Sequence, residues 1–292
     1  MIQVSQLEKI IKRRTILSNI SFEIKSGECV ALIGPNGAGK TTLMSCLLGD
    51  RKVTKGQVLL DGLAPQTLSN KEKVAVLPQA NAIPTDLKVK ELLAFFQAIY
   101  KDSLTNAEID SLLRFSPEQK NQLAGKLSGG QKRILAFVIC LIGKPKLLFL
   151  DEPTAGMDTS TRQRFWEIVH GLKEEGVTIF YTSHYIEEVE HTAERILVLH
   201  QGKLLRDTTP FAMRSEEQEK EVTLPIDFAA VVEGLDTISE ISYKQDTVGF
   251  KTREIEQVWD CLQEAGCRIS DLEVQNKTLL NSLFDKTREE EA

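Results

Sequence analysis

The sequence lacks features that mark several large classes of protein. Its five cysteines are odd in number and form no C-x-x-C pair, which argues against a disulfide framework and predicts reduced core thiols in a cytoplasmic protein. The longest apolar run, Ile134–Gly143, falls short of the roughly 20 residues that a membrane-spanning helix needs. The net charge is −6 and no block of lysine and arginine is present, so we expect no binding to nucleic acid.

Apolar strand patterns alternate with helical patterns over the first two thirds of the chain. Glu28–Ile33 and Leu147–Leu150 are nearly continuous apolar runs, as expected for strands buried on both faces. Met1–Leu7 alternates like an edge strand. The alternation predicts an α/β fold with a largely parallel sheet and helices on both faces. Residues 82–143 show mainly helical periodicity and predict an inserted helical subdomain.

A boundary is predicted near Pro210 and the charged run Glu216–Glu221. Beyond it, strand patterns that include Ile238–Tyr243 and Ile269–Val274 flank a helix pattern at Glu254–Ala265. These patterns predict a small C-terminal α+β domain. The predicted organisation is an ATPase domain over 1–214, a linker over 215–221, an accessory domain over 222–286 and a disordered tail over 287–292.

The segment Gly34–Thr41 matches the phosphate-loop pattern G-x-x-x-x-G-K-[ST]. It lies between a predicted buried strand and a predicted helix, a context that argues against a glycine turn without a ligand. Glycines let backbone N–H groups surround phosphates, and the helix N-terminus adds positive charge. Lys40 is expected to reach the β- and γ-phosphates of ATP, and the Thr41 hydroxyl to bind Mg²⁺. The predicted nucleotide-binding residues here are Gly34, Pro35, Asn36, Gly37, Ala38, Gly39, Lys40, Thr41 and Thr42.

Two carboxylates follow the predicted strand Leu147–Leu150. Asp151 and Glu152 would lie at the carboxyl end of a parallel strand, where open α/β sheets place their ligand chemistry. Asp151 is suited to hold Mg²⁺ and Glu152 to polarise an attacking water. Taken alone, the pair is equally compatible with two solvated acids at a strand end. The phosphate loop upstream favours the catalytic interpretation.

The pentapeptide Leu127-Ser128-Gly129-Gly130-Gln131 brings these motifs together. With the phosphate loop before it and LLFLDE after it, the chain resembles the nucleotide-binding subunit of an ABC (ATP-binding cassette) transporter over about Ile2–Arg214. The resemblance implies a P-loop NTPase fold of ABC type, with a mixed, mainly parallel sheet core, an antiparallel β edge and the inserted helical subdomain.

The resemblance also assigns roles to single residues. Gln79 resembles the Q-loop glutamine, which is expected to contact Mg²⁺ and to link the site to a membrane partner. Asp158 ends a D-loop segment in which Met157 stands where leucine is usual, and His184 resembles the switch histidine. The expected catalytic residues are Glu152, His184, Gln79 and Lys40, with Mg²⁺ held by Thr41, Gln79 and Asp151. The LSGGQ segment of one subunit would face the ATP bound to another in a head-to-tail dimer.

One departure concerns the adenine base. By alignment, the position at which the family usually has a stacking aromatic residue is Ile11, and no Tyr, Phe or Trp occurs from Met1 to Ser21. Adenine is therefore expected to rest on an aliphatic surface. We expect modest ATP affinity and poor discrimination between ATP and GTP.

The run Leu127–Asp158 looks most like the ATPase subunits of bacterial ABC-2-type exporters. That likeness implies a separate integral-membrane permease, a location at the cytoplasmic face of the cell membrane, and a homodimer or a heterodimer with another ABC ATPase. The C-terminal Ile269–Phe284 resembles the accessory domain of such subunits, although an unrelated stabilising appendage is an alternative. A regulatory or sensing ATPase that transports little stays open as an alternative. A soluble ABC ATPase without a transport role is disfavoured by the single phosphate loop and the absence of sustained heptads.

Overall fold

The computed structural model describes residues 1–80, 83–216 and 219–276, and the predicted tail 287–292 lies outside them. The chain forms two compact units, Met1–Thr209 and Pro210–Ala292. The boundary predicted after Arg214 falls within helix α9 (Pro210–Glu216), and the predicted linker overlaps α9 and strand β10 (Lys220–Pro225). Proline is well suited to the first position of a helix, so Pro210 begins α9 where the sequence suggested a break.

A six-stranded sheet forms the centre of the first unit, in the order β5-β6-β7-β3-β8-β9. Its strands are β5 (Val74–Leu77), β6 (Leu147–Asp151), β7 (Thr178–Ser183), β3 (Cys29–Ile33), β8 (Arg195–His200) and β9 (Lys203–Thr208). The first five are mutually parallel, which confirms the predicted α/β architecture. β9 pairs antiparallel with β8. The sequence did not predict β9 because four of its six residues, Lys203, Arg206, Asp207 and Thr208, are polar.

A second, antiparallel sheet has the order β2-β1-β4. It consists of β2 (Arg14–Ile24), β1 (Ile2–Ile11) and β4 (Lys55–Leu60). The prediction that the N-terminal strand is an edge strand is wrong, because β1 pairs on both sides. Its residues Ile2 and Leu7 are fully buried in a core that also contains Leu32 of β3 and Phe180 of β7. This shared core joins the two sheets.

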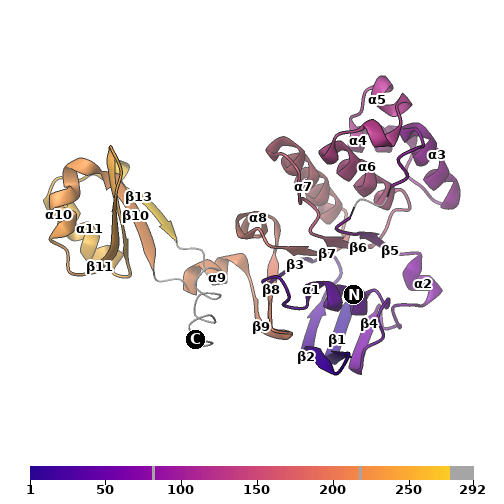
Figure 1. Ribbon diagram of the computed structural model, residues 1–292, viewed down its shortest axis with the longest axis horizontal. Coiled ribbons are helices and arrows are strands. Elements are labelled where there is room, and N and C mark those ends of the chain that lie inside the picture. Colours follow the sequence, from indigo (N-terminus) through magenta and orange to yellow (C-terminus); the bar gives the residue numbers. More distant parts are fainter. Residues whose placement is uncertain (81–82, 217–218, 277–292) are drawn as a thin grey trace. The chain divides into compact units, whose positions relative to one another are not determined.

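The first unit also contains α-helices. They are α1 (Lys40–Leu47), α2 (Leu68–Lys71), α3 (Val89–Ile99), α4 (Asn106–Leu113), α5 (Pro117–Asn121), α6 (Gly129–Leu141), α7 (Thr159–Glu174) and α8 (Ile186–Thr192). Figure 1 shows α3 to α6 grouped together as a helical layer. Thr105 and Glu108 form the predicted capping box that begins α4, as residues of these types do at helix starts. In the described part of the chain, no helix is long and apolar enough to cross a bilayer.

The second unit contains a four-stranded antiparallel sheet in the order β11-β12-β10-β13. Its further elements are α10 (Ala229–Glu233), β11 (Ile238–Tyr243), β12 (Thr247–Thr252), α11 (Ile255–Glu264) and β13 (Glu273–Asn276). This βαββαβ order is the ferredoxin-like arrangement. The predicted strand Ile269–Val274 is wrong in its first half. Asp271 accepts a hydrogen bond from the Arg268 N–H and closes a 3₁₀ turn at Ile269–Asp271, so β13 begins only at Glu273.

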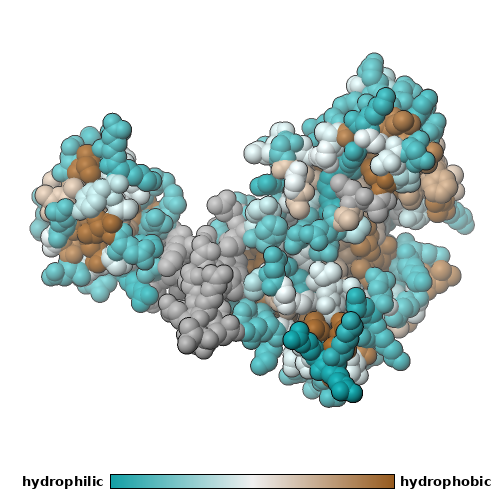
Figure 2. Space-filling model, viewed as in Figure 1, coloured by the Kyte–Doolittle hydropathy of each residue, from teal (hydrophilic) through white to brown (hydrophobic). Residues whose placement is uncertain are grey.

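The molecular surface is mainly hydrophilic on the face seen in Figure 2. Several large apolar side chains are nonetheless exposed, among them Leu68, Phe95 and Ile99. The prediction that all the cysteines are core thiols is wrong for Cys261, which is exposed on α11, whereas Cys29 of β3 is buried. All five cysteines are free thiols.

Candidate active site

Most of the predicted catalytic segments follow neighbouring parallel strands. β5, β6, β7 and β3 are adjacent in the sheet, and they lead into Gln79, Glu152, His184 and the phosphate loop Gly34–Thr41 respectively. Parallel strands end at the same edge of a sheet, so these four segments lie along one edge. This edge is where α/β proteins bind ligands.

Glycine is required at two positions of the phosphate loop. A Cβ on Gly34 would lie 2.1 Å from the Leu199 carbonyl oxygen of β8, so only glycine fits there. Gly39 has φ +107°, and a Cβ there would lie 2.9 Å from the Leu17 side chain. The loop backbone therefore passes close to Leu199 of β8 and Leu17 of β2, where a side chain would not fit.

Lys40 is buried at the start of α1. Its Nζ donates to the carbonyl oxygens of Gly34, at 2.6 Å, and Pro35, at 3.2 Å. Burial lowers the pKa of Lys40, while the nearby carboxylates of Glu152 and Asp151 act in the opposite direction. The ammonium is thus held inside the loop by neutral carbonyls, which phosphate oxygens can replace.

Thr182, near the end of β7, makes hydrogen bonds with Asp151, the last residue of β6, and with Glu152, which follows it. Its fully buried hydroxyl accepts from the Glu152 N–H at 2.9 Å and donates to Asp151 Oδ1 at 2.6 Å. Glu152 has φ +43°, in the left-handed region. Such strained backbone is typical of functional sites and persists where surrounding contacts fix it. The Thr182 hydroxyl supplies one such contact.

Two other predicted catalytic residues, Gln79 and His184, lie next to the Glu152 carboxylate. Gln79 Nε2 donates to Glu152 Oε2 at 2.8 Å, and His184 Nδ1 lies 3.5 Å from Glu152 Oε1. The His184 ring packs against that of Tyr185, which in turn lies under the Arg162 guanidinium. A carboxylate contacted by an amide and an imidazole can orient a water and accept its proton.

The LSGGQ segment begins α6. Ser128 caps the helix by accepting from the Gln131 N–H at 3.2 Å, and Gln131 Oε1 accepts in return from the Ser128 N–H at 3.0 Å. A Cβ on Gly130 would lie 3.1 Å from Thr161 and 3.4 Å from Asp158 Oδ2. The predicted D-loop residue Asp158 therefore packs against the LSGGQ segment of its own chain.

Asp158 is the N-cap of α7. It accepts hydrogen bonds from the Thr161 N–H and hydroxyl and from the Ser160 hydroxyl. These donors, led by Ser160, hold the pKa of the Asp158 carboxyl far below its usual range. The residue stays an anion and fixes the start of α7.

The oxygen donors at this edge suit Mg²⁺ bound together with a nucleotide. Asp151 supplies a carboxylate and Thr41 an exposed hydroxyl. Mg²⁺ in such sites usually takes one or two protein ligands and completes its shell with phosphates and water. The described residues contain no cluster of three or more His, Cys, Asp or Glu side chains that could hold a metal without such help. Ile11 is half-buried at the end of β1, where it pairs with Arg14, and its contact with adenine stays a prediction.

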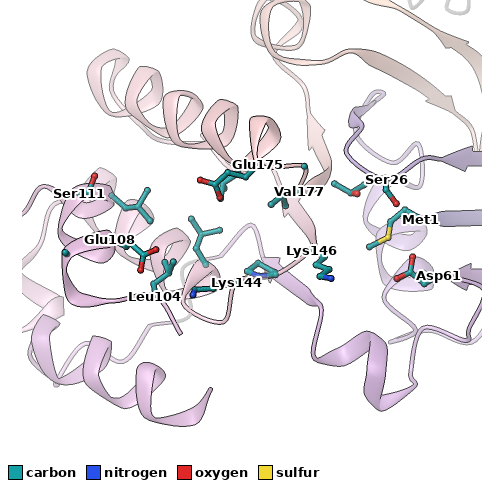
Figure 3. A pocket seen from close by; sticks show the side chains of 17 residues that line it. Met1, Ser26, Asp61, Leu104, Glu108, Ser111, Lys144, Lys146, Glu175 and Val177 are labelled. Atoms are coloured by element: carbon teal, nitrogen blue, oxygen red, sulfur yellow. The ribbon is translucent and has the colours of Figure 1, made fainter. Parts of the chain in front are cut away.

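A large open cavity lies away from these residues. It measures about 1200 Å³ and is lined by residues such as Glu108 and Ser111 of α4 and Lys144 and Lys146 before β6. Figure 3 shows these side chains around the hollow. The cavity adjoins the amino ends of β6 and β7, and none of the predicted site residues lines it. Chemistry and not size therefore identifies the candidate site.

The sequence did not single out Thr182 or Arg133. Thr182 is a polar residue at the end of a strand whose other residues include Ile179 and Phe180. Arg133 is a charged residue that is 3% exposed on the apolar helix α6. In both cases, the sequence signal that could have indicated a functional role was a polar side chain within an apolar pattern that predicts burial.

The strand–glycine loop–helix unit and the acidic strand end define a P-loop nucleoside triphosphatase. A family model described as "ABC transporter" matches residues 17–155. The linearmycin resistance ATP-binding protein LnrL of Bacillus subtilis is 36% identical over 214 residues, covering 70% of this chain and 68% of that protein. A Nod factor export ATP-binding protein I of Burkholderia orbicola is 34% identical over 222 residues, covering 74% and 73%.

Among solved structures, cbiO1 from Clostridium perfringens, part of the ABC transporter complex cbiONQ, superimposes with a TM-score of 0.64. It is 26% identical, and the match covers 74% of this chain and 90% of that one. The chain belongs to the ABC transporter family of ATP-binding proteins and is an ABC-type ATPase.

Proposed function

We propose that this chain is the ATP-hydrolysing subunit of a bacterial ABC-2-type exporter, and that it drives a separate membrane permease from the cytoplasmic face of the membrane. The relatives named for linearmycin resistance and Nod factor export support the export assignment. The similar cassette cbiO1 is part of a multi-component transporter complex, which supports a separate membrane partner.

The observation that carries the hydrolytic role is the convergence of Gln79 and His184 on the Glu152 carboxylate. Glu152 would accept a proton from the attacking water, and the backbone and Lys40 would hold the phosphates. Thr41, Asp151 and Gln79 would hold Mg²⁺, which neutralises phosphate charge when bound. His184 would contact the γ-phosphate and so distinguish ATP from its hydrolysis product.

The active assembly is proposed to be a head-to-tail dimer with ATP between the subunits. The N-terminus of α6 suits an anion because the first N–H groups of a helix have no acceptor in the helix backbone and the helix dipole is positive at this end. A Cβ on Gly129 would meet nothing within 4 Å, and Gly129 and Ser128 are exposed. Packing within the chain therefore gives no reason for glycine at position 129, whereas close approach of a phosphate from another subunit does.

Size-exclusion chromatography of the full chain tests the dimer. Glu152→Gln should form a dimer only with ATP and Mg²⁺, because ATP persists at the interface. Adding Gly129→Asp, which places a carboxylate where phosphate is expected, should abolish that dimer while the monomer still binds ATP. An unchanged dimer in the double variant would contradict the role of LSGGQ. Co-purification of the wild-type chain with an integral membrane protein tests the transport assignment, and recovery from membranes without such a partner would count against it.

A further inference from the structure

Arg133 joins the LSGGQ helix to the ends of two strands. The residue lies on the second turn of α6 and is 3% exposed. Its Nε donates to the Pro153 carbonyl oxygen at 2.8 Å. Nη1 donates to the carbonyl oxygens of Pro78, at 2.5 Å, and Gln79, at 3.3 Å. Nη2 donates to those of Asp151, at 3.1 Å, and Glu152, at 3.4 Å.

These five carbonyls belong to two segments far apart in the sequence. Pro78 and Gln79 follow β5, whereas Asp151, Glu152 and Pro153 lie at the end of β6 and just after it. A guanidinium presents five N–H donors in a rigid, planar fork, so one side chain can fix both segments at once. A lysine ammonium has three donors on a single atom and cannot span them in the same way.

The bound segments carry the catalytic side chains. Gln79 and Glu152 are joined by a 2.8 Å hydrogen bond between their side chains. Arg133 in addition binds the main-chain carbonyl oxygens of both residues. Burial lowers the pKa of Arg133, while the Cys140 and Asp151 charges act in the opposite direction. The side chain is nonetheless a cation, because an arginine guanidinium is not deprotonated in proteins. Its positive charge faces the carbonyl dipoles and interacts favourably with the negative charges of the nearby Asp151 and Glu152 carboxylates.

We propose that Arg133 is a positioning residue that fixes Glu152 and Gln79 in their hydrolytic geometry and ties that geometry to the LSGGQ helix. The inference rests on the proposed function for the assignment of Glu152 as the base. Ser128, the N-cap, and Arg133 belong to the same helix, α6. A displacement of α6 on contact of Ser128 with nucleotide is therefore transmitted through the Arg133 guanidinium to the ends of β5 and β6.

Steady-state ATPase kinetics of the full chain test the proposal, with kcat expressed per nucleotide-binding site from titration with a fluorescent ATP analogue. Arg133→Met should keep KM and the Kd for the analogue within about threefold and lower kcat by about 10- to 100-fold, because small displacements of catalytic groups have such effects. The kcat of Arg133→Lys should lie between those of the wild type and Arg133→Met. Arg164→Met is the matched control, since Arg164 is half-buried and donates to the Leu112 carbonyl oxygen, outside the site. It should keep the wild-type kcat.

A second comparison separates positioning from general destabilisation. If Arg133 acts through Glu152, Arg133→Met should lower the single-turnover rate little further in a Glu152→Gln chain. The proposal would be overturned if Arg133→Met lowered the single-turnover rate by the same factor in the Glu152→Gln chain as in the wild type. It would also be overturned if Arg133→Met kept the wild-type kcat per binding site while Glu152→Gln lowered it. A wild-type kcat in Glu152→Gln itself would instead overturn the proposed role of the base.

Discussion

Replacing Thr182 by valine should reduce both stability and turnover, because one hydroxyl serves two groups of the site. Valine keeps the shape but leaves the Glu152 N–H without its acceptor and Asp151 Oδ1 without its donor. A hydrogen bond to a charged group contributes about 1.5–3 kcal/mol, and an unpaired buried N–H costs about 1–3 kcal/mol. Because the two losses share one side chain and are not fully additive, we expect the free energy of unfolding to fall by about 2–4 kcal/mol.

The same substitution at the other end of β7 provides the control. Thr178 is also buried, and its hydroxyl accepts from the Gly27 N–H at 2.9 Å. Thr178→Val should lower the free energy of unfolding by about 1–2 kcal/mol and leave kcat unchanged. Thr182→Val should lower kcat about tenfold or more, since the strained Glu152 backbone loses an anchor. Urea denaturation and phosphate release measure the two quantities, and equal kcat values for the two variants would refute the reasoning.

Four further predictions follow from single residues. Gly171→Ala should raise the free energy of unfolding by about 0.5–1 kcal/mol in urea denaturation, because Gly171 lies inside α7 and an added Cβ meets nothing within 4 Å; destabilisation would contradict this. With Ile11 at the proposed adenine position, the Kd values for ATP and GTP should agree within about threefold, measured by calorimetry, since no aromatic ring stacks on the base; a strong preference for ATP would contradict it. ATP affinity should fall as the pH rises toward 10, because the lowered pKa of Lys40 means that its ammonium loses its proton at a lower pH than an exposed lysine; binding titrations across the alkaline range check this, and a flat profile would argue against it. At about pH 8, iodoacetamide should label exposed Cys261 well before Cys29, because burial raises the pKa of Cys29 to about 12 and leaves little thiolate; mass spectrometry shows the order, and early labelling of Cys29 would refute it.

Local sequence patterns predicted the features that depend on nearby residues. The phosphate loop lies between β3 and α1 as expected, and Asp151 and Glu152 stand at the end of β6. The contacts of Arg133 and Thr182 could not be predicted in the same way. Their partners are mostly backbone atoms of segments far away in the chain, and only the strand order β5-β6-β7 brings those segments together. A polar residue in an apolar pattern shows that partners exist but does not identify them.

The strand order of the C-terminal unit was also not predictable from the sequence. Its strands were mostly recognisable from alternating apolar residues, but the order β11-β12-β10-β13 depends on how the strands pair, which periodicity does not specify. The start of β13 was missed because a local side chain–backbone hydrogen bond, from the Arg268 N–H to Asp271, favours a turn over extended backbone.

Phosphate release from ATP and Mg²⁺ by the wild-type chain and by Glu152→Gln, each with its membrane partner, tests the central claim most directly. Glutamine keeps the shape of the side chain, and its amide oxygen can still accept from Gln79, but the amide has no carboxylate charge and cannot accept a proton. The account predicts steady turnover by the wild type, and ATP binding without turnover in the variant. Equal rates of phosphate release by the two proteins would contradict it, because the water would then be activated without Glu152.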